Sequence, residues 1–284
     1  EPNRRDPTVR LATIRTPEGS RAVRVDGDTL VDLGYSDLGD LLAQNNWARA
    51  AAAATGPTYP AEDAAYATLV SRPSKAICVG LNYKNHIMEM GRTLPEHPTL
   101  FTKLPDTLIG ANDPIARPAE TDAFDWECEL TIVIGSRVRR AGSEEAAAAI
   151  AGFTVANDVT CRDWQSRTRE WTQGKNWDST TPVGPVMVTP DELPGGTRPH
   201  CRISTTVNGD IKQEDDTGDL LFDPVTLVQY VSTIIRLNPG DLILTGTPGG
   251  VGHARKPPVY LAAGDTVEVA VEGIGTLRNR VVAD

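Results

Sequence analysis

The spacing of apolar and polar residues predicts a chain built mainly of short strands. Between about Val9 and Leu33, apolar and polar residues alternate in RLATIRT and AVRVDGDTLVDL, and PEGS and DGD supply turn residues. The alanine- and leucine-rich stretch from about Leu38 to Ala54 predicts a helix. A polar, proline-bearing stretch, TGPTYPAEDA, follows it. We therefore place a domain boundary near residue 72, between a small N-terminal α/β domain (1–72) and a larger domain (73–284).

The larger domain is predicted to be strand-rich with few helices. One helix is expected in SEEAAAAIAG, with Ser143 as its N-cap, and another from Val225 to Leu237. The predicted strands are KAICVGLNY, WECELTIVIG, FTVANDVT, PVMVTP, RISTTVNGDIKQ, GDLILTGTP and DTVEVAVEGIGTLRNRVV. The whole pattern predicts an α+β fold.

Three carboxylates stand out among these strands. On a strand through WECELTIVIG, Cys128, Leu130, Ile132 and Ile134 would share an apolar face, and Glu127 and Glu129 the other, about 7 Å apart. Carboxylates this close repel unless a cation joins them, and Asp158, at the end of FTVAND, could complete the set. Without nearby His or Cys, the set favours Mg²⁺, Mn²⁺ or Ca²⁺ over zinc. The alternative is a solvated polar face on an edge strand.

A histidine and a glutamate form a second candidate group. In NYKNHIME, His86 and Glu89 would lie on one face of a short helix, within side-chain reach. A carboxylate beside an imidazole raises its pKa and orients it as a general base. The alternative is a surface pair without a function.

Two loops and several missing motifs narrow the chemistry. Lys175 follows Gly174 in QGKNWD, where an ammonium could meet an anion, and TGTPGGVG allows backbone N–H groups to approach an anionic ligand. Either segment could equally be a plain loop. The sequence contains no GxSxG, P-loop, GxGxxG or HExxH pattern, which removes the usual support for serine hydrolases, NTPases, dinucleotide enzymes and zincins.

Composition excludes further classes of partner. The 284 residues carry a formal net charge of -10, and the basic residues are scattered, which argues against nucleic acid and anionic membranes. The four cysteines form no CxxC and fit reduced thiols in the cytosol. No apolar run approaches the roughly 18–20 residues of a membrane span, and no secretory signal is evident. We expect a soluble, cytoplasmic protein.

Six ordered segments resemble the fumarylacetoacetate hydrolase family. They are GLNYKNHIMEMG, LFTKLPDTLIG, DWECELTIVIG, ANDVTCRDWQ, QGKNWDSTTPVGP and LILTGTPGGVG, and the resemblance runs from about Lys75 to Val282. It implies a mixed β-sandwich roll and a Mg²⁺ or Mn²⁺ site, with Ca²⁺ possible in vitro.

The resemblance also implies roles for individual residues. Glu127, Glu129 and Asp158 match the metal ligands, and His86 with Glu89 matches a dyad that activates water. Lys175 matches a lysine that faces the substrate's oxygens. Residues matching the substrate-binding positions are Gln165, Thr247, Gly246 and Arg162, the last expected to support the site together with Asp163.

The function implied is hydrolysis of a C–C bond in a small diketo acid, such as an acylpyruvate, by water attack on a metal-polarised carbonyl. Two alternatives within the family are decarboxylation of a β-keto acid such as oxaloacetate and isomerisation of a 2-oxo-hexene-dioate in aromatic catabolism. A binding protein with a relic metal site is the non-enzymatic alternative. The resemblance also implies a homodimer or larger homo-oligomer, to which residues 216–230 are expected to contribute.

Overall fold

A long mixed β-sheet forms the centre of the computed structural model, which describes residues 9–89 and 91–284. The strand order along this sheet is β4-β3-β2-β1-β14-β12-β11-β17-β6-β7, with β5 paired to β1 and β8 paired to β14. These strands are β1 (Arg10–Thr16), β2 (Gly19–Asp26), β3 (Thr29–Asp32), β4 (Thr58–Pro60), β5 (Ala65–Tyr66), β6 (Ala76–Gly80), β7 (Thr99–Lys103), β8 (Leu108–Ile109), β11 (Cys128–Ile134), β12 (Ile150–Asn157), β14 (Thr181–Val188) and β17 (Leu242–Leu244).

A second sheet packs against the middle of the first and makes the sandwich. Its order is β16-β15-β18-β19-β9, built from β15 (Arg202–Val207), β16 (Asp210–Asp216), β18 (Thr266–Val271), β19 (Gly275–Ala283) and β9 (Ile115–Arg117). Strands β11, β12 and β14 contact β15, β18 and β19, and one hydrophobic cluster joins the two sheets. Alternation explains this, since Cys128, Leu130, Ile132 and Ile134 all belong to that cluster, as the sequence predicts.

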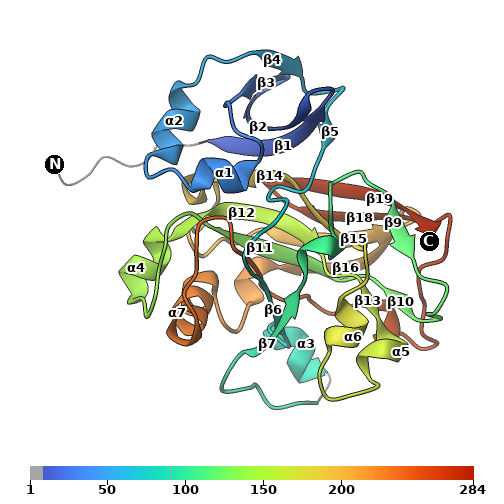
Figure 1. The fold of residues 1–284 in the computed structure, drawn as a ribbon. Coiled ribbons are helices and arrows are strands. Elements are labelled where there is room, and N and C mark those ends of the chain that lie inside the picture. The colour runs from blue at the N-terminus through green and yellow to red at the C-terminus, as the bar shows by residue number, and fades with distance from the viewer. Residues whose placement is uncertain (1–8, 90) are drawn as a thin grey trace.

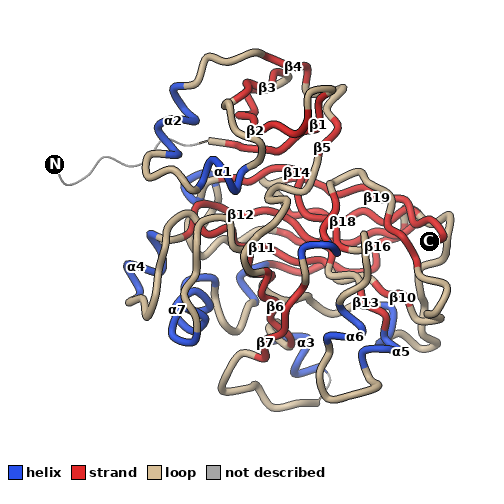
Figure 2. Tube along the Cα trace, viewed as in Figure 1, coloured by secondary structure: helices blue, strands red, loops and turns tan. Residues whose placement is uncertain are grey.

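The helices lie around the strands (Figures 1 and 2). At the end of the molecule away from the N-terminal strands, α3 (Lys84–Glu89), α5 (Arg162–Gln165) and α6 (Thr172–Lys175) gather near β6 and β7 (Figure 1). The short pair β10 (Phe124–Asp125) and β13 (Thr160–Cys161) lies beside them. The sheets and helices together form the strand-rich α+β sandwich expected from the sequence.

The N-terminal strands continue the central sheet. Strand β1 pairs antiparallel with β14, Arg10 opposite Val188 and Leu11 opposite Met187, so the sheet crosses the boundary predicted near residue 72. A second hydrophobic cluster unites Leu38 and Leu41 of the N-terminal region with Val133 and Leu244 of the central strands. The division into two domains at residue 72 stays a prediction.

Three helix predictions need correction. The helix expected over residues 38–54 is two helices, α1 (Leu38–Leu42) and α2 (Trp47–Ala53), separated by a turn at exposed residues 43–46. The turn contains Asn45 and Asn46, whose side chains compete with helical hydrogen bonding.

The N-cap assignment is also wrong, because α4 (Ser143–Ala148) has Gly142 as its N-cap. The carboxylate of Glu145 accepts the hydrogen bond of the Gly142 N–H at 3.1 Å. The last helix, α7 (Pro224–Ile234), begins after Asp223, whose side chain accepts from the Thr226 N–H. It ends three residues before the predicted Leu237. Within the described ranges, none of these helices combines the length and apolar character needed to cross a bilayer.

Candidate active site

A cavity of about 260 Å³ brings most of the predicted site residues together, where β6, β7 and β11 meet helices α3, α5 and α6. Its walls include a few apolar side chains, among them Val79, Phe101 and Trp171. The predicted residues that line it are His86, Glu127, Glu129, Arg162, Gln165, Lys175 and Thr247. Because these residues lie far apart along the chain, the fold itself assembles the site.

Three buried carboxylates cluster at this cavity, and two of them, Glu127 and Glu129, line it. We call this cluster, with the lysines that pair with it, the floor of the cavity. Oxygen atoms of Glu127, Glu129 and Asp158 lie within 4.8 Å of one another, and the three residues are 7%, 1% and 0% exposed. Antiparallel pairing of β11 with β12 places them together, because Glu129 stands opposite Ala156 and the Asp158 N–H donates to the Glu127 carbonyl. Glu127 and Asp158 each lie one residue outside their strands, at the strand ends that face the cavity.

Three cations hold two of these carboxylates. Lys175 Nζ lies 2.7 Å from both Glu127 Oε2 and Asp158 Oδ2, and Lys103 Nζ lies 2.8 Å from Asp158 Oδ1. Arg162 joins Glu127 Oε1 at 2.7 Å and Asp125 at 2.8 Å. Among the ion pairs of the described residues, Glu129 has no such partner; its Oε2 accepts the Gly246 N–H at 2.8 Å. With Asp125 counted, four carboxylates face the three cations Lys103, Lys175 and Arg162. One negative charge is therefore left without a counterion.

The pKa directions follow this imbalance. Burial, and then the charges of Asp158 and Glu127, raise the pKa of Glu129 well above its usual value. Burial would also raise the pKa of Asp158, but Lys103 and Lys175 outweigh it and lower that pKa. The Lys175 pKa is raised, because Asp158 and Glu127 outweigh the effect of burial, so its ammonium stays charged.

The donor set fits a hard divalent cation. Three carboxylates within one ion's reach, without His or Cys among them, are oxygen ligands of the kind that Mg²⁺, Mn²⁺ and Ca²⁺ prefer. A dication here would supply the counterion that Glu129 lacks. Glu127, Glu129 and Asp158 are thus a candidate divalent-metal site, and the preferred ion stays a prediction.

Lys175 reaches the carboxylates because the backbones of α5 and α6 lie very close together. A Cβ at Gly174 would lie 2.6 Å from the backbone nitrogen of Gln165, so only glycine lets α6 pack this tightly on α5. Gln165 itself accepts a hydrogen bond from Arg162 Nη1 at 3.1 Å. The predicted supporting residue Asp163 accepts from the Thr121 hydroxyl.

The opposite wall is the loop after β17. Gly246 adopts a φ of +105°, and its amide points at Glu129 as described above. The next residue, Thr247, lines the cavity, and its hydroxyl oxygen accepts a hydrogen bond from Gln213 at 2.8 Å. The predicted substrate-binding role of this loop stays a prediction, although its position beside the carboxylates suits it.

The rim carries the predicted dyad. His86 is half-buried on α3 and lines the cavity, whereas the side chain of Glu89 lies outside the described residues, so the dyad stays a prediction. The start of this segment is anchored by the buried Asn82, whose amide donates to the Thr245 and Phe222 carbonyls and accepts from the Phe222 N–H.

Sequence reasoning missed three supporting residues. Lys103 is fully buried against Asp158. It ends the strand TLFTK, and because lysine is almost never fully buried unless it is paired, a lysine at this position could have indicated a buried carboxylate close by. Asp125 accepts from Arg162 and from the Gly252 and His253 N–H groups. Nothing in the sequence predicted a buried role for Gln213, because its polar neighbours in DIKQEDD are typical of a solvent-exposed strand.

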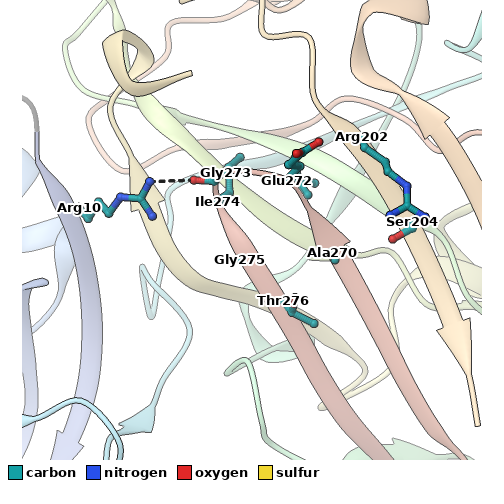
Figure 3. A pocket seen from close by; sticks show the side chains of 10 residues that line it. Arg10, Arg202, Ser204, Ala270, Glu272, Gly273, Ile274, Gly275 and Thr276 are labelled. Carbon is teal, nitrogen blue, oxygen red and sulfur yellow. Dashed lines mark hydrogen bonds between the residues drawn. The ribbon is translucent and has the colours of Figure 1, made fainter. Parts of the chain in front are cut away.

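Other hollows lack this chemistry. In the one of about 500 Å³ beside β18 and β19, Arg10 donates to the Gly273 carbonyl (Figure 3). Arg10 also pairs with Glu192, and Arg202 pairs with Glu214. A hollow of about 900 Å³ between the α1–α2 turn and α4 is lined by residues such as Leu42, Trp47 and Ala147. Neither gathers carboxylates and lysines, so the acid–lysine cavity is the candidate active site.

Known proteins share this architecture. The chain is 42% identical over 237 residues, 83% of its length and 75% of the relative's, to the mitochondrial oxaloacetate tautomerase Fahd2a of Rattus norvegicus. A fumarylacetoacetate hydrolase structure from Exiguobacterium antarcticum superposes with a TM-score of 0.86 at 33% identity, covering 97% of this chain and 100% of that one. A 5-carboxymethyl-2-hydroxymuconate delta-isomerase structure from Mycobacterium smegmatis gives 0.81 at 35% identity, with the same coverage.

The family profile described as fumarylacetoacetate (FAA) hydrolase C-terminal matches residues 75–282, which include every predicted site residue. This range agrees with the extent of the resemblance found in the sequence. With a profile match over most of the chain, the protein belongs to the fumarylacetoacetate hydrolase family.

Proposed function

We propose that this enzyme moves a proton on a small 2-oxo dicarboxylic acid, interconverting its keto and enol forms, with oxaloacetate as the first substrate to test. The observation that carries the proposal is the small cavity whose floor joins a carboxylate triad to a protonated lysine. The similarity to the rat oxaloacetate tautomerase supports the choice of substrate. The hydrolysis expected from the sequence becomes the second candidate.

Size favours a short substrate. Pockets for drug-sized ligands begin at about 300 Å³, and this cavity, at about 260 Å³, is smaller. A four-carbon keto acid with one further ion fits that space more easily than a long acyl chain. The cavity mouth also carries Arg92, a cation suited to a second carboxylate.

The chemistry divides among residues that surround one space. Glu127, Glu129 and Asp158 would hold a divalent cation, which would supply Lewis-acid polarisation of the 2-oxo group. The imidazole of His86 takes the proton from C3, and the electrons of that C–H bond form the C2=C3 double bond. The Lys175 ammonium stabilises the negative charge that develops on the C2 oxygen. The protonated imidazole then gives its proton back, through solvent, to the C2 oxygen; this completes the enol, and the reverse steps restore the ketone.

Hydrolysis would use the same residues and one additional reactant, a water molecule. His86 would then deprotonate a water that attacks the carbonyl of an acylpyruvate, and the departing enolate would be stabilised by Lys175. The solved fumarylacetoacetate hydrolase relative favours keeping this candidate. Tautomerisation needs no positioned water, and it is the simpler reaction for this site.

One assay set separates the two. The Mg²⁺-loaded protein is given enol oxaloacetate, acetylpyruvate and fumarylpyruvate in parallel, and enol decay, pyruvate release and CO₂ release are followed. Enol decay well above the uncatalysed rate, without pyruvate from either acylpyruvate, is the expected result. Pyruvate plus a carboxylic acid from an acylpyruvate, with no effect on the enol, would replace the proposal with hydrolysis. Release of both CO₂ and pyruvate from oxaloacetate, without enol–keto interconversion, would replace it with decarboxylation.

A further inference from the structure

A buried glutamine joins the carboxylate strand β11 to the loop after β17, on two sides of the candidate active site. Gln213 lies on β16, is 1% exposed, and uses its whole side-chain amide. Its Oε1 accepts from the Cys128 N–H at 3.0 Å and from the Thr205 hydroxyl at 2.8 Å. Its Nε2 donates to Thr247 Oγ1 at 2.8 Å and to the Pro248 carbonyl at 2.9 Å. Two acceptor and two donor positions are therefore all filled.

Two backbone groups fix which way this amide points. A backbone N–H, as at Cys128, can only donate, and a backbone carbonyl, as at Pro248, can only accept. The oxygen of Gln213 must therefore face Cys128, and its nitrogen must face Pro248 and Thr247. A flipped amide would set an oxygen against the Pro248 carbonyl and a nitrogen against the Cys128 N–H.

This orientation determines the role of the threonine hydroxyl. The amide nitrogen of Gln213 has no lone pair to offer, so Thr247 Oγ1 accepts from it and cannot donate to it. The hydroxyl hydrogen of Thr247 must therefore point either toward the neighbouring Cys128 thiol or into the active-site cavity that Thr247 lines. A neutral thiol is a weak acceptor, so an anion in the cavity would take this donor. Cys128 stands between Glu127 and Glu129, so the same amide ties this donor to the carboxylate strand.

We propose that Gln213 is a positioning residue that sets the Thr247 hydroxyl as a hydrogen-bond donor to a carboxylate of the substrate. It acts through Thr247 and does not touch the substrate. The inference rests on the proposed function only in that the cavity receives a small anionic acid.

The test is a double-mutant cycle read by equilibrium binding. Oxalate, an unreactive dicarboxylate, is titrated calorimetrically into Mg²⁺-loaded wild type, Gln213→Met, Thr247→Val and the double variant. Losing a hydrogen bond to a charged group corresponds to about a 10- to 100-fold loss of affinity. We expect that loss in each single variant, and little further loss when Gln213→Met is added to Thr247→Val. Because Thr247→Ser keeps the hydroxyl, it should restore most of the affinity.

Matched variants separate positioning from general damage. Thr205→Val removes a partner from the far side of the same amide but leaves both Nε2 contacts, so it should keep oxalate affinity within about twofold of wild type. Gln213→Glu keeps the side-chain volume but replaces the donor with an acceptor, and it should lose affinity in the wild-type background and little in the Thr247→Val background. Mg²⁺ affinity, measured without oxalate, should stay within a few-fold throughout.

Three results would overturn the proposal. The first is an equal loss of oxalate affinity for Gln213→Met in the wild-type and Thr247→Val backgrounds. The second is a loss of affinity in Thr205→Val as large as in Gln213→Met. The third is a wild type that binds oxalate no better than Thr247→Val. Failure of the proposed function looks different, since wild type would then bind oxalate in this pattern and still leave oxaloacetate unchanged.

Discussion

The floor and the rim of the active-site cavity are built on opposite principles. The floor consists of Glu127, Glu129, Asp158, Lys103 and Lys175, all at most 7% exposed; the first four lie on strands or directly beside them, and Lys175 ends helix α6. The rim consists of the six-residue helix α3 together with Arg92; His86 is half-buried, and Met88 and Arg92 are exposed. We expect a division of labour, in which the floor holds the buried charges and the rim supplies His86 as the base.

The largest effect is expected at the floor, in Asp158→Ala. This change leaves the ammonium groups of Lys103 and Lys175 without one of their carboxylates, and breaking a buried ion pair costs about 3–5 kcal/mol. Urea unfolding followed by circular dichroism should show that loss in the free energy of unfolding, together with loss of Mg²⁺ binding. The exposed ion pair of Asp210 with Lys212 provides the matched control, since Asp210→Ala should cost less than about 1 kcal/mol. Equal stability of the two variants would contradict a floor held together by buried ion pairs.

The next effect belongs to the rim, in His86→Asn. If the imidazole moves the proton, the rate should fall by about 10²- to 10⁴-fold, while the free energy of unfolding changes by no more than about 0.5 kcal/mol. Steady-state kinetics and Mg²⁺ titration on the same preparation would check both. His97→Asn is the control, because this exposed residue stacks on Tyr230 and does not line the cavity. A His86 variant that turns over like wild type would remove this residue from the mechanism.

A smaller effect is expected at the mouth, in Arg92→Met. An exposed cation that meets a second carboxylate contributes about 0.2–1 kcal/mol, so KM for a dicarboxylic keto acid should rise by about 2- to 5-fold with kcat little changed. Arg236→Met alters an exposed arginine that does not line the cavity and should leave KM unchanged. A fall in kcat without a change in KM would indicate another role for Arg92.

The smallest effect concerns thiols close to the floor and far from it. Burial raises the pKa of Cys161 to about 12 and that of Cys201 to about 11, so both are neutral thiols at pH 8. A thiolate-selective reagent should label neither in the native state and both in urea. Because folding raises these pKa values above 9.0, the stability they contribute is complete below pH 9 and declines as the pH rises toward 11 and 12. Rapid native labelling of Cys161 at pH 8 would show that the floor opens.

The same contrast explains what the sequence could predict. The carboxylate triad was predictable because strand alternation in WECELTIVIG puts Glu127 and Glu129 on one face and Asp158 ends the strand FTVAND; the family resemblance implied the same three residues. Lys103 and Gln213 were missed because their partners lie on strands that only the fold brings together. The break between α1 and α2 was missed because alanine-rich propensity hides a short asparagine turn. The local residue pattern predicts which charged residues share one strand. An ion pair between two elements can be predicted only when the topology that brings the elements together is known.

The most direct measurement is exchange of the C3 hydrogens of oxaloacetate in deuterated buffer, followed by proton NMR. Wild type loaded with Mg²⁺ should accelerate exchange well above the uncatalysed background, and Lys175→Met should lose about 10²- to 10³-fold of that acceleration, as removal of an oxyanion-stabilising donor does. Exchange at the background rate in wild type, or an unchanged rate in Lys175→Met, would contradict a site built to hold the charge of an enolate.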